Sequence, residues 1–100
     1  MVAPLITSKT AGIEEICRRH RIRRLSVFGS AGRNEFRPDS DIDLLVEFDA
    51  HAPVGLVEYA RTRQELQDLL GREIDLVTER SLRPELRDSI LATAAVLYAK

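Results

Sequence analysis

Two aspartates two residues apart, Asp41 and Asp43, are the residues whose type and spacing most directly predict chemistry. They begin a stretch to Phe48 in which apolar residues alternate, which predicts a strand. Residues two apart on a strand share a face, so their Cβ atoms lie roughly 7 Å apart at ~3.3 Å rise per residue. Two like charges there are unfavourable unless a cation lies between them. Carboxylate oxygens of this kind suit Mg²⁺, which binds one or two protein carboxylates together with phosphate oxygens.

A third carboxylate, Asp75, occurs in a matching context. It lies in the alternating stretch Glu73 to Val77, which also predicts a strand. If the two strands are neighbours and their apolar faces are aligned, Asp75 emerges on the same side as Asp41 and Asp43. Three converging carboxylates are enough to hold two divalent ions about 3.5–4 Å apart, an arrangement that promotes in-line displacement at phosphorus.

The dipeptide Gly29-Ser30 supplies a complementary feature. It ends the expected strand of residues 25–28, and glycine permits a tight turn there. Free N–H groups at the start of a following short helix, with the Ser30 hydroxyl, suit triphosphate oxygens. Arg33, one turn further on, is placed to add a charge-assisted bond to phosphate.

Each of these features has an ordinary structural explanation when taken alone. Gly-Ser is a frequent loop dipeptide, and Asp-x-Asp at the start of a strand is often a solvated edge. The combination is more informative, because about ten residues separate Ser30 from Asp41 and a second aspartate-bearing strand follows. Together the features indicate a nucleotide site.

The composition bounds the class of protein. One hundred residues suffice for one domain, expected to span 1–100, with 44% hydrophobic and 31% charged residues. The net charge of -1 gives no expectation of direct DNA binding. No apolar run is long enough to cross a membrane. With a single cysteine and no secretory signal pattern, a cytoplasmic location is expected.

The predicted elements form an α/β (α+β) domain, a small mixed β-sheet flanked by helices. Residues 1–7 are expected to be a loose lead-in because Pro4 discourages an early helix. A helix with Ser8 or Thr10 as N-cap precedes the first strand. The remaining expectations are strands over 25–28, 41–48 and 73–77, a helix over 54–70 with Leu56 on its apolar face and Gly71 as C-cap, a helix from Pro84 to about Ala92, and 96–98 as either strand or helix.

Other polar and aromatic groups favour structural roles. Cys17 and His20 lie on the apolar face of the first helix and His51 lies in a loop. Tyr59 and Tyr98 are interpreted as packing residues rather than acceptors of a nucleotidyl group. The basic run Arg18–Arg24 has two interpretations: a contact for an acidic partner, or a solvated helix end whose cations suit the helix dipole.

The strings Phe28 to Phe48, Gly71 to Thr78 and Arg87 to Leu91 resemble the minimal nucleotidyltransferases of the DNA polymerase β-like superfamily. The resemblance covers roughly residues 20–100 and implies that superfamily's fold. It also implies catalytic and metal-binding roles for Asp41, Asp43 and Asp75, with two Mg²⁺ ions and ATP as substrate. The remaining implied roles are triphosphate contacts at Gly29, Ser30 and Arg33.

Many members of that group are antitoxins paired with a HEPN-domain toxin, onto whose tyrosine they transfer AMP. The resemblance therefore implies a HEPN partner and a hetero-oligomer. Ala31 and Asn34 depart from the family pattern, which commonly has arginine and glycine there. Two alternatives stay open: a nucleotide-binding subunit that neutralises its partner by direct binding, and a transferase acting on a small molecule or RNA end.

Overall fold

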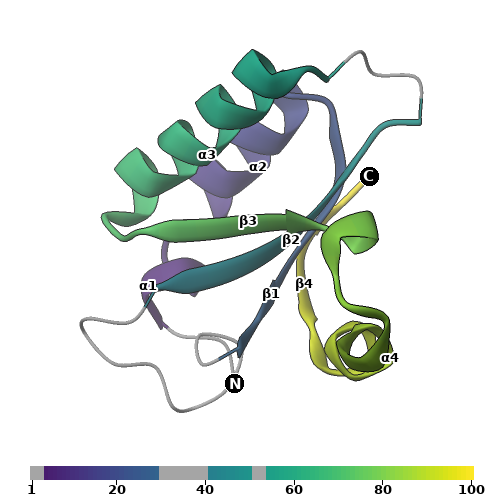
Figure 1. The fold of residues 1–100 in the computed structure, drawn as a ribbon. Coiled ribbons are helices and arrows are strands. Elements are labelled where there is room, and N and C mark those ends of the chain that lie inside the picture. The colour runs from purple at the N-terminus through teal and green to yellow at the C-terminus, as the bar shows by residue number, and fades with distance from the viewer. Residues whose placement is uncertain (1–3, 30–40, 51–53) are drawn as a thin grey trace.

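A computed structural model describes residues 4–29, 41–50 and 54–100 (Figure 1). Four helices and four strands make up the described part of the chain, together with one short 3-10 helix. In order they are α1 (Pro4–Thr7), α2 (Thr10–Arg19), β1 (Ile22–Phe28), β2 (Ile42–Phe48), α3 (Leu56–Leu70), β3 (Ile74–Thr78), η2 (Glu79–Ser81), α4 (Pro84–Thr93) and β4 (Ala95–Ala99).

The strands form one mixed sheet in the order β3-β2-β1-β4. β1 is antiparallel to both β2 and β4, whereas β2 and β3 run parallel because α3 connects them as a crossover. Figure 1 shows α2 and α3 over one face of the sheet and α4 beyond the other. The predicted α+β class, a small mixed sheet flanked by helices, is confirmed.

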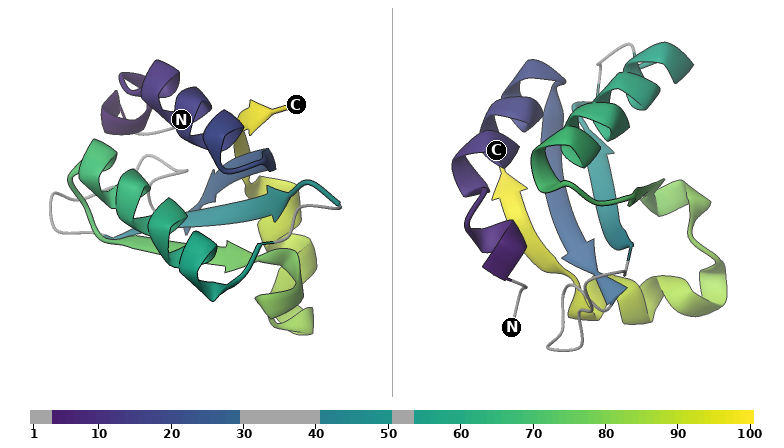
Figure 2. Two further views of the ribbon diagram at one scale, coloured as in Figure 1. Left: turned by 90° about the horizontal axis from the view of Figure 1, so that it is seen from above. Right: turned by 90° about the vertical axis from the view of Figure 1, so that its left-hand side faces the viewer.

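The hydrophobic core lies between the sheet and the α2–α3 layer. Ile42, Leu44 and Val46 alternate along β2 and are almost fully buried, as the spacing predicts. The other core residues are Ile6, Ile13, Ile16, Cys17, Ile22, Leu25, Val27, Leu66, Leu70, Ile74 and Leu76. Figure 2 shows α2 and α3 side by side on this face from two further directions. The opposite face, which carries Asp43 and Asp75, is called the open face.

The N-terminal prediction was wrong in part. Residues Pro4–Thr7 form a helical turn instead of a loose lead-in, and Ile6 on that turn is fully buried. Proline is compatible with the first helical position, where its missing N–H has no partner to lose. The N-cap of α2 is Lys9, without a side-chain bond, rather than Ser8 or Thr10.

The other predicted boundaries lie close to those in the structure. β1 begins at Ile22, three residues before the expected start, and β4 resolves the ambiguity at residues 96–98 in favour of a strand. Leu56, expected in the apolar stripe of α3, is 83% exposed because it stands in the first turn, before the helix meets the sheet. Gly71 caps α3 in the left-handed conformation, with φ of 67°.

The basic run is largely paired with local carboxylates. Arg18 lies 3.6 Å from Glu14, and Arg23 lies 3.8 Å from Glu47. Arg19 pairs with Glu65 of α3. These contacts favour the interpretation of a solvated helix end over a surface held for an acidic partner. Within the described ranges, no helix combines the length and apolar character needed to span a membrane.

Candidate active site

The parallel pairing of β2 and β3 places two of the three predicted carboxylates in register. Asp43 is the direct partner of Asp75, between the pairs Ile42–Ile74 and Leu44–Leu76. Because side chains alternate along both strands, directly paired residues project from the same face. Ile42, Leu44, Ile74 and Leu76 are buried in the core. Asp43 and Asp75 therefore project from the open face of the sheet.

Electrostatic crowding is measurable at Asp43. Partial burial is the main cause that raises the pKa of this carboxyl above its ordinary 3.8, and the charges of Asp75 and Asp41 raise it further. Asp41 directly precedes β2 and is exposed. The charges of Asp75 and Asp41 thus disfavour ionisation of Asp43, and a bound cation would relieve this repulsion.

The backbone at Gly29 lies directly against the Asp43 carboxylate. Gly29 has a φ of 68°, in the left-handed region that L side chains rarely adopt. A Cβ added at this position would clash with Oδ2 of Asp43. Phe28, the preceding residue, is the direct β1 partner of Asp43. Glycine is therefore required both for the turn after β1 and for the space that the carboxylate occupies.

The three carboxylates do not form a closed cluster. Across residues 4–29, 41–50 and 54–100, no three His, Cys, Asp or Glu side chains stand together as ready metal ligands. Within the same ranges, no ion pair reaches Asp41, Asp43 or Asp75. The assignment of Asp41, Asp43 and Asp75 as catalytic and metal-binding residues stays a prediction. Ser30 and Arg33, the other expected contacts, lie outside the described residues.

Tyr59 of α3 is the aromatic residue that the sequence predicts to pack rather than to accept a nucleotidyl group. It packs against the core, as predicted. Burial raises the pKa of its phenol, and the negative charge of Asp75 raises it further. Helical spacing identifies only the packing role, because the influence of Asp75 depends on the β2–α3–β3 crossover, which no local pattern reveals.

A second group of carboxylates, Glu58 and Glu65, has side-chain partners on α2 and at its end. Nδ1 of His20, at the end of α2, lies 2.7 Å from Oε1 of Glu58, and Nε2 contacts Glu65. Glu65 also pairs with Arg19. His20 is only 7% exposed. These contacts join α2 to α3, so the structural interpretation of His20 is confirmed.

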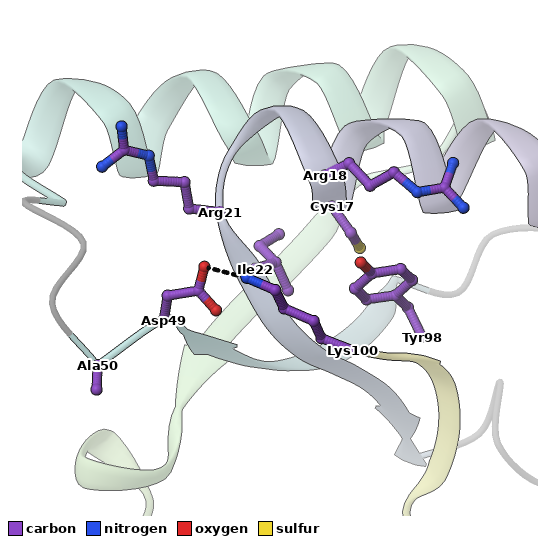
Figure 3. Close-up of a pocket in the computed structure, with 8 residues that line it drawn as sticks. All are labelled: Cys17, Arg18, Arg21, Ile22, Asp49, Ala50, Tyr98 and Lys100. Carbon is purple, nitrogen blue, oxygen red and sulfur yellow. Dashed lines mark hydrogen bonds and ion pairs between the residues drawn. The ribbon is translucent and has the colours of Figure 1, made fainter.

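A hollow of about 580 Å³ opens at the opposite end of the sheet from the carboxylates (Figure 3). Its lining includes Cys17, Arg18, Tyr98 and the ion pair Lys100–Asp49, whose atoms are 3.0 Å apart. Burial, chiefly, raises the pKa of the Cys17 thiol to about 12, so the thiolate is not available as a nucleophile. The thiol in this hollow is therefore not an alternative nucleophile.

Comparison with known proteins identifies the family. The family described as "Nucleotidyltransferase domain" matches residues 11–97. A curated protein of Methanocaldococcus jannaschii, named "Putative protein adenylyltransferase MJ0435", is 43% identical over 76 residues. These make up 76% of this chain and 80% of that protein.

Solved structures agree with this assignment. One described as "Structure of putative minimal nucleotidyltransferase" superposes with a TM-score of 0.78 at 39% identity, covering 94% of each chain. A structure of a tri-AMPylated HEPN toxin of Shewanella oneidensis in complex with MNT antitoxin superposes with a TM-score of 0.67, covering 95% of this chain and 73% of the matched chain. At 20% identity the latter match concerns the fold alone. The chain belongs to the nucleotidyltransferase domain family and is an enzyme of nucleotidyl transfer.

Proposed function

We propose that this enzyme transfers AMP from ATP to a tyrosine hydroxyl of a HEPN-domain toxin and thereby acts as an antitoxin. The observation that carries the proposal is the register of Asp43 and Asp75 on the open face, beside the Gly29 turn. The names of the relatives support the acceptor class, because one is named "Putative protein adenylyltransferase MJ0435" and a neighbouring structure is described as holding a tri-AMPylated HEPN toxin.

The reaction exchanges one bond at phosphorus for another. The acceptor oxygen attacks the α-phosphorus of ATP, the bond from that phosphorus to the bridging oxygen breaks, and pyrophosphate leaves. The acceptor proton must be removed in this step. Asp75 is the candidate general base, because it is exposed on the face from which an acceptor approaches. The products are the AMP ester of the acceptor, pyrophosphate and a proton.

The donor set fits a divalent cation. Asp41, Asp43 and Asp75 offer carboxylate oxygens, the ligands that Mg²⁺ prefers. Burial, and then the charges of Asp75 and Asp41, raise the pKa of Asp43, and a cation would relieve the repulsion among these charges. When bound, Mg²⁺ supplies positive charge that neutralises the phosphates and orients the substrate. The chain's own contribution is to hold Asp43 against the Gly29 turn, where a larger residue would displace it. Two ions are expected, with Ser30 and Arg33 as further contacts to the triphosphate.

The variant Asp41→Asn/Asp43→Asn tests the proposal and separates it from neutralisation by direct binding. We expect transfer of labelled AMP from ATP to a HEPN-domain toxin that the unmodified chain modifies to fall at least about 10³-fold, because charge stabilisation at phosphorus is lost. Asp68→Asn, an exposed carboxylate on α3, is the matched control and should transfer AMP normally.

Two readouts decide the outcome, label transfer and rescue of growth from the toxin. Loss of both in the Asp41→Asn/Asp43→Asn variant supports the proposal. Loss of transfer with full rescue shows that direct binding neutralises the partner. Transfer that survives in this variant contradicts the assigned site. Transfer to a small molecule or an RNA end instead of the protein contradicts the acceptor class.

A further inference from the structure

The open face carries an apolar row directly beside the carboxylates. Val96, Ser26 and Leu45 are successive partners across β4, β1 and β2. Leu45 in turn pairs with Val77 of β3. This row lies two residues along the strands from the Asp43–Asp75 pair, a separation of roughly 7 Å. The apolar row and the carboxylates therefore form one continuous surface.

Helix α4 stands over this row but contributes nothing to the core. None of its ten residues is buried. Leu91 is 43% exposed, and Val96 on the adjacent strand is 57% exposed. A hollow of about 100 Å³ lies between helix and sheet, and its apolar lining is Leu45, Val46, Leu91, Ala94 and Val96. We call this hollow and the apolar row the α4 groove.

The charges around the α4 groove do not favour nucleic acid. Two of its lining residues are carboxylates, Glu47 and Glu79, and one is a cation, Arg24. A phosphate backbone requires the opposite balance. An exposed apolar surface with a mixed polar rim is instead typical of a site for another protein.

We infer that the α4 groove is the docking surface for the protein that carries the acceptor hydroxyl. The inference rests on the proposed function, since it concerns the partner of the same site. An acceptor on a protein has to reach Asp43 and Asp75 from the open face, because α2 and α3 cover the other face. The partner's surface must then lie against the adjoining α4 groove, where Leu91 and Val96 are exposed. Burial of Leu91 and Val96 under the partner supplies the hydrophobic contact that holds the acceptor at the carboxylates.

Two substitutions in the α4 groove have matched controls elsewhere on the chain. Leu91→Glu/Val96→Glu places two carboxylates in the groove. Leu56→Glu/Val57→Glu introduces the same changes at a leucine and a valine that are 83% and 67% exposed on α3. The measurement is the dissociation constant for a HEPN-domain toxin, taken without ATP. We expect the groove variant to bind at least about 30-fold more weakly and the control to change less than about 3-fold.

Val96→Thr and Val57→Thr form a second pair, which guards against loss of folding because threonine keeps the branched shape. Val96→Thr should weaken binding about 3- to 10-fold, whereas Val57→Thr should not. Both should bind ATP with Mg²⁺ as the unmodified chain does, since neither residue is among the expected ATP and Mg²⁺ contacts. Equal affinities for the groove and control variants would overturn the inference, as would the absence of any complex with the unmodified chain.

The same experiment distinguishes failure of the inference from failure of the proposed function. If the groove variants lose binding but the unmodified chain transfers no AMP, the docking surface is supported and the proposed transfer reaction is contradicted. If AMP is transferred and the groove variants bind normally, the transfer reaction is supported and the docking surface is contradicted. Self-association through the groove, seen as a dimer that Leu91→Glu/Val96→Glu dissociates, would assign the surface to a second copy and overturn the inference.

Discussion

Two groups of carboxylates in this small domain have opposite electrostatic surroundings. Glu58 and Glu65 contact His20 between α2 and α3, and Glu65 also pairs with the positive charge of Arg19. Asp43 and Asp75 are direct partners across β2 and β3, and no cation among the described residues pairs with them. The first group holds two helices together, and the second places negative charge on the open face without a cationic partner in the described part of the chain.

The difference appears in the pKa values. Burial pushes the pKa of Glu65 upward, but the hydrogen bond from His20 and the charges of His20 and Arg19 lower it below its ordinary value. The pKa of Asp43 is raised by burial and by two neighbouring carboxylates. A folded protein keeps such unfavourable charge where a ligand is to bind, so uncompensated carboxylates indicate a site more reliably than acidic residues as such.

Among changes that leave the three carboxylates in place, substitution of Gly29 should have the largest effect on activity. Gly29→Ala places a Cβ against Oδ2 of Asp43, and we expect AMP transfer to fall about 100-fold because small displacements of a reacting group are costly. Gly71→Ala is the matched control, since its φ of 67° is equally strained but no atom lies within 4 Å of the added Cβ. Both variants should lose about 1–2 kcal/mol of unfolding free energy. Equal losses of transfer rate in the two variants would contradict the role of Gly29.

Stabilisation by ATP and Mg²⁺ should depend on Asp43 and not on Glu65. In excess ATP and Mg²⁺, at 100 times the dissociation constant, the free energy of unfolding should rise about 2.7 kcal/mol. Asp43→Asn should remove most of this gain, whereas Glu65→Gln should keep it in full, although its unliganded form is less stable. Thermal unfolding with and without the ligands measures both. A gain that survives in Asp43→Asn would place the nucleotide elsewhere.

Substitution of His20 should weaken the contact between α2 and α3 without changing the rate of AMP transfer. His20→Ala leaves Glu58 and Glu65 without their shared partner, and we expect a loss of about 2 kcal/mol in urea unfolding. Arg18→Ala breaks an exposed helical pair instead and should cost less than about 0.5 kcal/mol. AMP transfer at a temperature where His20→Ala is folded should be unchanged. A lower transfer rate there would show that the two regions are coupled.

Much of the fold follows from local pattern. The alternation of Ile42, Leu44 and Val46 fixes which face of β2 is buried, and Gly71 marks the end of α3. Local pattern mispredicts burial where packing against another element determines it. Ile6 is buried by the packing of a short turn that no periodicity predicts, and Leu56 remains exposed because α3 begins beyond the edge of its contact with the sheet.

In the candidate site, too, some features follow from local pattern and others depend on how the strands pair. Spacing alone predicts that Asp43 and Asp75 lie on strand faces, and the parallel register confirms that the face is shared. The clash that any side chain at Gly29 would make with Asp43 depends on the β1–β2 pairing. The α4 groove was not predicted, because the pattern predicts a helix from Pro84 to about Ala92 but does not reveal that α4 buries none of its residues.

The two regions should respond to pH with opposite signs. The raised pKa of Asp43 means that the folded state binds a proton more readily than the unfolded state, so this residue lowers stability as pH rises above 3.8. The lowered pKa of Glu65 means that its contribution is complete above 4.5 and is lost as pH falls through its folded-state value.

Urea unfolding between about pH 3 and about pH 7 can separate these contributions. At neutral pH, Asp43→Asn should raise the free energy of unfolding by less than about 1 kcal/mol, because water screens a half-exposed carboxylate. Glu65→Gln should lower it, with the difference from the unmodified chain disappearing at acid pH. If Asp43→Asn instead destabilises the protein at neutral pH, its charge is compensated in the folded state, and the contrast between the two groups of carboxylates does not hold.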